Sequence, residues 1–185
     1  MARDYTEIPL DQSHRLINHG PVVLLSTKNA DGTYDIAPIA WNCPASKAPP
    51  KLLVVIGRTH RTWENIERTG QFIVVVPHRS QRKLVMETGS VSGRDVNKFP
   101  KFGIDAFSGV RVDALIPSGC VGFLECEVDG RLDGPKANTV LGRVLRSAAV
   151  TGTFDDRLLV ETEAGQTLHH LGGSMFATPA AQVLT

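Results

Sequence analysis

The sequence predicts a mainly β fold in which mostly antiparallel strands close into a barrel, with a few helices at its periphery. Apolar runs recur along the chain at spacings too short for a helix to separate each pair, which favours antiparallel neighbours. Several of these runs are almost entirely aliphatic, as expected of strands that are covered on both faces. Helical patterns, in contrast, are few and short.

The first two strands are predicted to form a hairpin. Residues 22–25 are an apolar run after Gly20-Pro21, and residues 34–41 provide the returning strand. Between them lies Asn29-Ala30-Asp31-Gly32, which is typical of a tight turn because glycine accepts a positive φ and Asn and Asp tolerate it. The two strands are therefore expected to be antiparallel neighbours.

Four later segments are also predicted to be strands. Residues 51–56 and residues 72–76 are almost all aliphatic, and residues 139–150 are rich in Val, Leu and Ala. In residues 124–129 apolar and acidic side chains alternate, and this period of two indicates a strand with one packed face and one wet face. The wet face is expected to carry Glu125, Glu127 and Asp129.

The clearest helix is predicted over residues 62–68. Thr62 is of a type that caps a helix start, and Thr69-Gly70 is a typical helix end. Trp63 and Ile66 lie three residues apart, so they share the face that packs inward.

A second short helix is predicted over residues 80–87, with Leu84 and Val85 pointing inward. The pattern of residues 155–171 is compatible with either helix or strand. No repeat, low-complexity segment or linker divides the 185 residues, so a single domain, residues 1–185, is expected.

Charge and cysteine content restrict the class of protein. Twenty basic and 19 acidic residues give a net charge of +1, which argues against a broad cationic surface for nucleic acid or anionic lipid. No apolar run approaches the roughly 20 residues that span a bilayer, and the polar start of the chain does not resemble a signal peptide. Cys43, Cys120 and Cys126 are odd in number and lack CxxC spacing, which fits a reducing cytoplasm. Cys120 and Cys126 either pair or, as we expect, stay buried free thiols.

Common catalytic and metal-binding motifs are absent. The sequence contains no GxxxxGK[ST], GxGxxG, HExxH or GxSxG, although Gly89-Ser90-Val91-Ser92-Gly93 differs from the last only by Val91 at the serine position. His169 and His170 are adjacent, so on a strand they would point to opposite faces and would not chelate a metal. We therefore expect neither a metal site nor a catalytic side chain.

An ordered set of motifs between residues 20 and 75 carries a family resemblance. In order, these are Gly20-Pro21 before a strand, Asp31-Gly32 in a turn, Ala37-Pro38-Ile39-Ala40-Trp41-Asn42 at a strand end, Pro49-Pro50, Arg58-Thr59-His60-Arg61-Thr62 in a polar loop, and Thr69-Gly70. The arrangement resembles the flavin reductase-like family, whose members include flavoredoxin. The resemblance implies an FMN-binding split β-barrel of Greek-key type that works as a homodimer.

The likeness continues as far as residue 176 and so covers most of the chain, with two departures. It includes residues 93–99, 140–144 and 171–176. Phe176 stands where the family often has tyrosine, which removes a hydroxyl near the cofactor, and Gly142-Arg143 replaces a more usual Gly-Glu.

One FMN-binding segment is expected at the polar loop. Arg58, Thr59, His60, Arg61 and Thr62 bring two guanidinium groups, two hydroxyls and an imidazole to a helix start, where backbone N–H groups and the helix dipole favour an anion. The same composition also suits an ordinary solvated strand-to-helix loop. The resemblance favours the flavin phosphate as its ligand.

The second FMN-binding segment is expected at the strand end that contains Ile39, Ala40, Trp41 and Asn42. The resemblance implies that its backbone lies along the flavin ring, with Trp41 covering the ring and Asn42 bonding to its polar edge or to the ribityl chain. Trp41 is alternatively a core or dimer-interface residue. Lys98 is expected either at the phosphate or ring O2, or as a solvated lysine.

The C-terminal segment is the third candidate. Gly172-Gly173 and Phe176 resemble a stretch that approaches the flavin or the partner subunit. His169 and His170 are either neighbours of the ligand or ordinary surface histidines.

The predicted activity is NAD(P)H-dependent reduction of FMN, with FAD as the less favoured flavin. The isoalloxazine carries the redox chemistry, so the protein has only to place it and control access. Alternatives are a flavoredoxin-like electron carrier without nicotinamide activity, another split-barrel use such as pyridoxamine phosphate oxidation or haem handling, and a binding module without cofactor. The sequence does not choose between NADH and NADPH, identify the electron acceptor, or tell a tight cofactor from an exchanging substrate.

Overall fold

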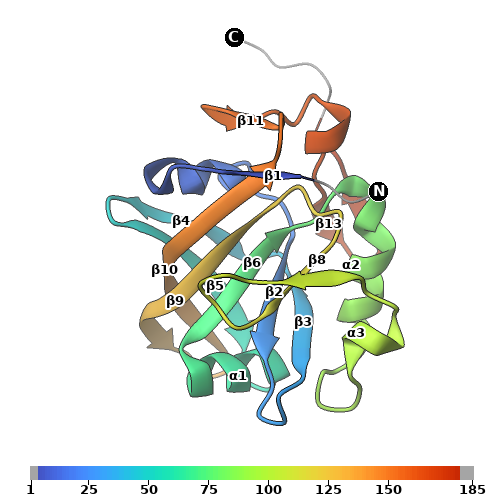
Figure 1. The fold of residues 1–185 in the computed structure, drawn as a ribbon. Helices are drawn as coiled ribbons and strands as arrows, with labels where there is room; N and C mark the ends of the chain where they lie inside the picture. The colour runs from blue at the N-terminus through green and yellow to red at the C-terminus, as the bar shows by residue number, and fades with distance from the viewer. Residues whose placement is uncertain (1–3, 180–185) are drawn as a thin grey trace.

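The computed structural model describes residues 4–179, so the first three and last six residues of the predicted domain lie outside the described residues. Eight strands form the main sheet in the order β3-β2-β6-β9-β10-β5-β4, with β1 on β10, and every neighbouring pair is antiparallel (Figure 1). The predicted mainly antiparallel architecture is confirmed. The strands are β1 Tyr5–Glu7, β2 Val23–Lys28, β3 Tyr34–Ile39, β4 Asn42–Lys47, β5 Pro50–Gly57, β6 Gln71–Val76, β9 Gly122–Asp133 and β10 Ala137–Val150.

Short helices and hairpins surround this sheet. The helices are α1 Arg61–Thr69, α2 Arg82–Gly89 and α3 Lys98–Lys101, with 3-10 turns η1 Leu10–Leu16, η2 Arg79–Gln81 and η3 Glu163–Gly165. Three small hairpins pair β7 Ala106–Ser108 with β8 Leu115–Pro117, β11 Phe154–Asp155 with β12 Arg157–Leu158, and β13 His169–Gly172 with β14 Met175–Ala177. The ambiguous stretch 155–171 thus resolves into short strands and one 3-10 turn. Among the described residues, no helix is both long and apolar enough to cross a membrane.

Strand β10 is bent, and its two ends pair with different strands on the side away from β9. Its first half, residues 137–143, pairs with β5, whereas its last three residues pair with β1. The pairing with β9 shifts register at Leu141/Gly142 and again at Val144/Arg146, and such bulges bend a strand. Gly142 lies where a Cβ atom would come within 2.5 Å of the Phe72 ring, so only glycine allows this close approach.

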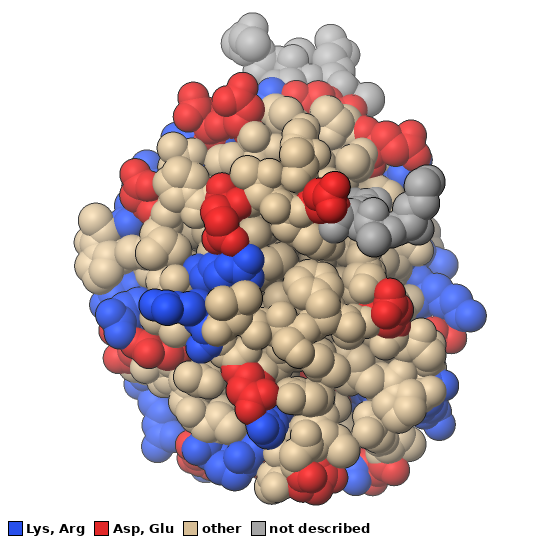
Figure 2. Space-filling model, in the orientation of Figure 1, with Lys and Arg blue, Asp and Glu red and all other residues tan. Residues whose placement is uncertain are grey.

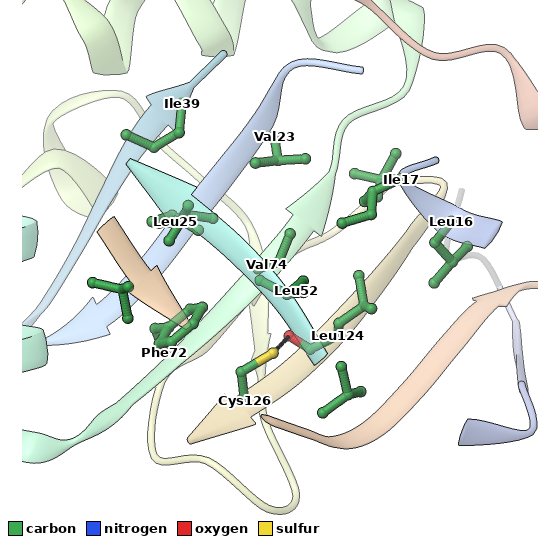
Figure 3. Packing of buried hydrophobic residues seen from close by; sticks show 14 of the residues in the cluster. Leu16, Ile17, Val23, Leu25, Ile39, Leu52, Phe72, Val74, Leu124 and Cys126 are labelled. Atoms are coloured by element: carbon green, nitrogen blue, oxygen red, sulfur yellow. Dashed lines mark hydrogen bonds between the residues drawn. The ribbon is translucent and has the colours of Figure 1, made fainter. Parts of the chain in front are cut away.

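The core occupies both faces of the central strands. Val23 and Leu25 of β2 point into the barrel with Phe72 and Val74 of β6 (Figure 3). The alternate residues of these strands, such as Leu24, join a second cluster beneath α2 and the β7–β8 hairpin. Burial on both faces explains why these strands are continuously aliphatic, as the sequence predicted.

The cysteine expectation is also confirmed. Cys120 and Cys126 are buried thiols that form no disulfide within the part of the chain that the structure describes, while Cys43 is exposed. Burial, together with the nearby Glu125 carboxylate, raises the pKa of Cys126, so its reactive thiolate is disfavoured.

On the face in Figure 2, basic and acidic side chains are interspersed.

The predicted strand 34–41 is too long at its end. Strand β3 stops at Ile39, and after Ala40 and Trp41 the chain re-enters the sheet as β4, a strand that the sequence pattern did not reveal. The Trp41 carbonyl accepts a hydrogen bond from the Val55 amide of β5 at 3.0 Å. The turn therefore transfers the chain from one end of the sheet path to the other.

The predicted wet face of β9 is wrong at Glu125. This side chain is fully buried, and its carboxylate accepts hydrogen bonds from the backbone N–H groups of Arg111 and Val112 at 2.6 and 2.8 Å. Arg146 of β10 donates to the same carboxylate at 2.7 Å. The segment between β7 and β8 covers this face, so the charge is matched by partners that lie far away in the sequence.

Breaking the Glu125–Arg146 pair is expected to lower the free energy of unfolding substantially. Arg146→Met leaves a buried carboxylate without its counter-ion, so we expect the free energy of unfolding to fall by about 3–5 kcal/mol. Denaturant unfolding at pH 7 provides the measurement. Arg143→Met, on the same strand, breaks only a half-exposed pair with Glu127 and should cost less than about 1 kcal/mol. Equal losses in the two variants would contradict the assignment.

A histidine pair anchors the β13–β14 hairpin to the barrel. The side chains of His19 and Thr167 are hydrogen bonded at 2.9 Å, and the Val22 amide donates to the Leu168 carbonyl at 2.8 Å. The rings of His19 and His169 lie 5.4 Å apart at 60°. Burial, with a smaller contribution from His169, lowers the pKa of His19 to about 4.

Because of the His19–His169 pair, we expect the free energy of unfolding to decrease in acid. The unfolded chain protonates His19 near pH 6.5 and the folded chain only near 4, so its stability contribution is complete above pH 6.5 and is lost as the pH falls toward 4. The loss amounts to at most about 3 kcal/mol. His19→Gln should flatten this part of the pH profile of unfolding, whereas His170→Gln, an exposed position on the same hairpin, should not. An unchanged profile in His19→Gln would rule out the pair as the cause.

Candidate functional site

Two adjoining pockets form one groove along β3. The polar pocket, of about 320 Å³, lies between β3, the start of α1 and the segment after α2. The apolar pocket, of about 310 Å³, lies between the end of β3, α2 and the β13–β14 hairpin. Both are lined by Pro38, Gly89 and Ser90, so the two pockets adjoin at these residues. Figure 1 shows α2 and α3 beside the β3 edge of the sheet, where this groove runs.

The start of α1 forms one wall of the polar pocket. The backbone turns sharply after β5, with the His60 amide donating to the Gly57 carbonyl at 3.1 Å. His60 is the N-cap residue and makes no side-chain capping bond, and the N–H groups of Arg61 and Thr62 have no acceptor within the helix. Thr59, His60, Arg61 and Thr62 all line the pocket, so the structure brings four of the predicted site residues together.

The predicted capping role of Thr62 is wrong. The helix begins two residues earlier than a Thr62 cap requires, which places Thr62 inside the first turn. Its hydroxyl instead donates to Asp35 Oδ2 at 3.4 Å. Thr62 therefore ties the helix start to β3.

Arg61 has donor capacity left over at the pocket. Its Nη1 donates to Glu64 Oε2 at 3.0 Å, and Glu64 also pairs with Arg94. Its buried Nε has no hydrogen-bond partner among the described residues. A buried donor without an acceptor is costly unless a ligand or water satisfies it.

The opposite wall is formed by Gly89-Ser90-Val91-Ser92-Gly93, the segment that resembles GxSxG except for Val91 at the serine position. Residues 88–93 comprise the last two residues of α2 and the four residues after it, and all six line the polar pocket. A Cβ atom on Gly93 would lie 2.2 Å from Asp35 Oδ1, and one on Gly89 would lie 2.9 Å from Pro38 Cγ. The two glycines thus allow this segment to approach β3. Small residues with hydroxyls at a helix end were the signal in the sequence, but they did not show which strand they face.

A buried ion pair lies at the polar pocket. Lys98 Nζ is 3.2 Å from Asp35 Oδ1, and the two side chains are 3% and 2% exposed. Lys98 Nζ also donates to the Ile36 carbonyl at 2.7 Å. Burial lowers the pKa of Lys98, and the Asp35 carboxylate opposes this by favouring the charged form. The alternative that Lys98 is a solvated lysine is therefore wrong, and sequence reasoning missed Asp35 altogether.

The apolar pocket brings Ala40 together with the C-terminal hairpin. His170, Gly173 and Phe176 of this hairpin line the pocket together with Ala40 and with Val85 and Met86 of α2. The hairpin is held to α2 because Arg82 donates to the Ser174 carbonyl at 3.0 Å and lies 5.7 Å from the centre of the Phe176 ring.

The remaining predicted site residues do not line either pocket. Ile39 is buried in the barrel core, and Arg58 donates to the Gly134 carbonyl at 3.3 Å. Asn42 Nδ2 donates to the Pro21 carbonyl at 3.0 Å, and its buried Oδ1 has no hydrogen-bond partner among the described residues. Trp41 is 71% exposed, so the alternative of a core residue is wrong.

The comparisons with known proteins agree on one family. The model of the flavin reductase-like domain matches residues 15–168. An uncharacterized Escherichia coli protein, YddH, is 32% identical over 182 residues, which are 95% of this chain and 96% of that protein. The reductase subunit HsaB of a flavin-dependent monooxygenase from Rhodococcus jostii is 31% identical over 114 residues, or 60% of this chain and 55% of that one.

Among solved structures, an FMN-binding domain of a flavin reductase-like enzyme from Shewanella baltica superposes with a TM-score of 0.88 at 27% identity. The superposition covers 100% of this chain and 99% of that one. The fold is thus the FMN-binding split barrel that the motifs predicted. With the groove along β3 and a domain match that spans most of its length, this chain belongs to the flavin reductase-like family.

Proposed function

We propose that this protein binds FMN in the groove along β3 and catalyses its reduction by NAD(P)H. The observation that carries the proposal is a polar pocket at a helix start that adjoins an apolar pocket along the same strand. FMN has the same two parts, a dianionic phosphate and a flat, largely apolar ring. Membership of the flavin reductase-like family supports this assignment.

The donors of the polar pocket fit a phosphate. The N–H groups of Arg61 and Thr62 stand at the positive end of the α1 dipole, which favours an anion by about 0.3–1 kcal/mol. The buried Arg61 Nε needs an acceptor, which a phosphate oxygen would provide. Thr59 and Ser92 add hydroxyls, and His60 an imidazole, to the same lining. Arg58 remains a predicted contact that depends on release of its bond to Gly134.

The apolar pocket fits the ring. Val85, Met86 and Phe176 offer apolar surface, and the backbone at Ala40 follows the end of β3. The unpartnered Oδ1 of Asn42 remains a predicted acceptor for the polar edge of the ring or the ribityl chain. Phe176 contacts a ligand only through its ring, since it lacks the hydroxyl of a tyrosine.

When bound, the flavin supplies the redox chemistry, accepting hydride from a nicotinamide and passing electrons on. The side chains of the groove have to bind, orient and shield it, and no acid–base pair is required of them. The expected homodimer stays a prediction, and a partner would cover the exposed side chains near the apolar pocket, Trp41, Leu171 and Met175.

The variant Arg61→Met tests whether the polar pocket binds the FMN phosphate. Loss of a charge-assisted bond worth about 1.5–3 kcal/mol should weaken FMN binding by roughly 10- to 100-fold. Titration of flavin fluorescence gives the dissociation constant. Arg68→Met removes an arginine from the other end of α1, away from both pockets, and should leave the affinity unchanged. Unchanged FMN affinity in Arg61→Met would show that Arg61 does not bind the phosphate.

Anaerobic reduction tests the catalytic part of the proposal. The purified protein with bound FMN should lose its visible flavin absorption when NADH or NADPH is added without oxygen. Free FMN at the same concentration is the control for uncatalysed reduction. Flavin that stays oxidised with both nicotinamides, but is reduced by dithionite, would show an electron carrier. Absence of flavin binding would refute the whole proposal.

A further inference from the structure

We propose that Asp35 and Lys98 are positioning residues that hold the two walls of the polar pocket in register for the flavin phosphate. The inference rests on the proposed flavin function and deepens it. It assigns the preference for a phosphorylated flavin to a buried ion pair as well as to the donors that face the ligand.

The pair connects the elements that form the polar pocket. Asp35 lies on β3 and accepts from the Thr62 hydroxyl in the first turn of α1. Lys98 begins α3, after the segment that forms the opposite wall, and its ammonium group donates back to the Ile36 carbonyl of β3. The Asp35 carboxylate also lies directly beneath Gly93, where even a Cβ atom would not fit.

Burial makes this connection rigid. Both side chains are at least 97% shielded from solvent, so breaking the pair would strand one charge in a poor solvent. Each charge therefore holds the other, and with it the attached element, in one place. Fixed walls increase the affinity of the polar pocket for an anion, because donors that are already fixed lose less entropy on binding.

The charge balance separates positioning from simple attraction. Asp35 and Lys98 cancel at the polar pocket, so the pair contributes little net charge toward a phosphate. If the pair acted only through its field, removing the Asp35 carboxylate would strengthen phosphate binding. If the pair positions the walls, removing either member weakens it.

The location of the pair adds a second distinction. Neither Asp35 nor Lys98 lines the apolar pocket. Loss of the pair should thus weaken binding of the flavin phosphate and leave binding of the flavin ring unchanged. Riboflavin, which has the same ring and ribityl chain but no phosphate, reports on the remainder of the groove.

The test compares FMN and riboflavin affinities of Asp35→Asn and Lys98→Met by fluorescence titration. Asparagine keeps the size of aspartate and an acceptor for Thr62, but it removes the counter-ion of Lys98. We expect each variant to bind FMN about 10-fold or more weakly, since 1.4 kcal/mol corresponds to tenfold, and riboflavin within about 3-fold of the wild type. Lys101→Met, an exposed lysine on the same helix, is the matched control and should alter neither affinity.

Each outcome is decisive. FMN-selective loss in both variants supports positioning. Tighter or unchanged FMN binding by Asp35→Asn, or equal loss of both flavins, overturns it. If Lys98→Met fails to fold, the double variant Asp35→Asn/Lys98→Met, which leaves no unpaired charge, carries the same comparison. Wild-type protein that binds neither flavin would refute the proposed function itself, whereas wild-type binding with unaffected variants refutes only this inference.

Discussion

Burial of the central strands on both faces is the constraint on which the rest of the structure depends. Strands β2 and β6 pack into the barrel on one side and against α2 and the β7–β8 hairpin on the other. Apolar surface covered on both sides of a sheet is the dominant favourable term in such a fold. Strand β3 pairs with β2 and lies at one end of the path of the main sheet.

The groove follows from this position. The path of the main sheet ends at β3, so its outer edge is free for helices and loops instead of another strand. The start of α1, the end of α2 and the start of α3 all meet there. Glycines at 89 and 93 let the chain come close to that edge, and the Asp35–Lys98 pair holds it there. A barrel whose edge strand is covered by helix ends thus presents backbone donors and small polar side chains at one place.

Buried charge is used in two different ways in this molecule. Glu125 receives two backbone N–H groups and Arg146, and this arrangement fastens the segment between β7 and β8 to the barrel. Asp35 forms an ion pair with Lys98 and accepts a hydrogen bond from the Thr62 hydroxyl, and these contacts lie at the groove. The first pair lies away from both pockets and serves stability, whereas the second lines the polar pocket, and we propose that it serves binding.

The sequence by itself determined the architecture and part of the site. The Asn29–Gly32 turn, the aliphatic strands and the helix ending at Gly70 follow from local periodicity and turn chemistry, and the order of the motifs identified the family. The polar loop at residues 59–62 was found because its residue types lie next to one another. Only the tertiary structure decided that Glu125 is buried, that Lys98 pairs with Asp35, and that residues 88–93 face the polar loop. The physical reason is distance along the chain: a period or a turn is written in adjacent residues, but the counter-ion of Lys98 lies more than 60 residues away, and packing alone brings the two together.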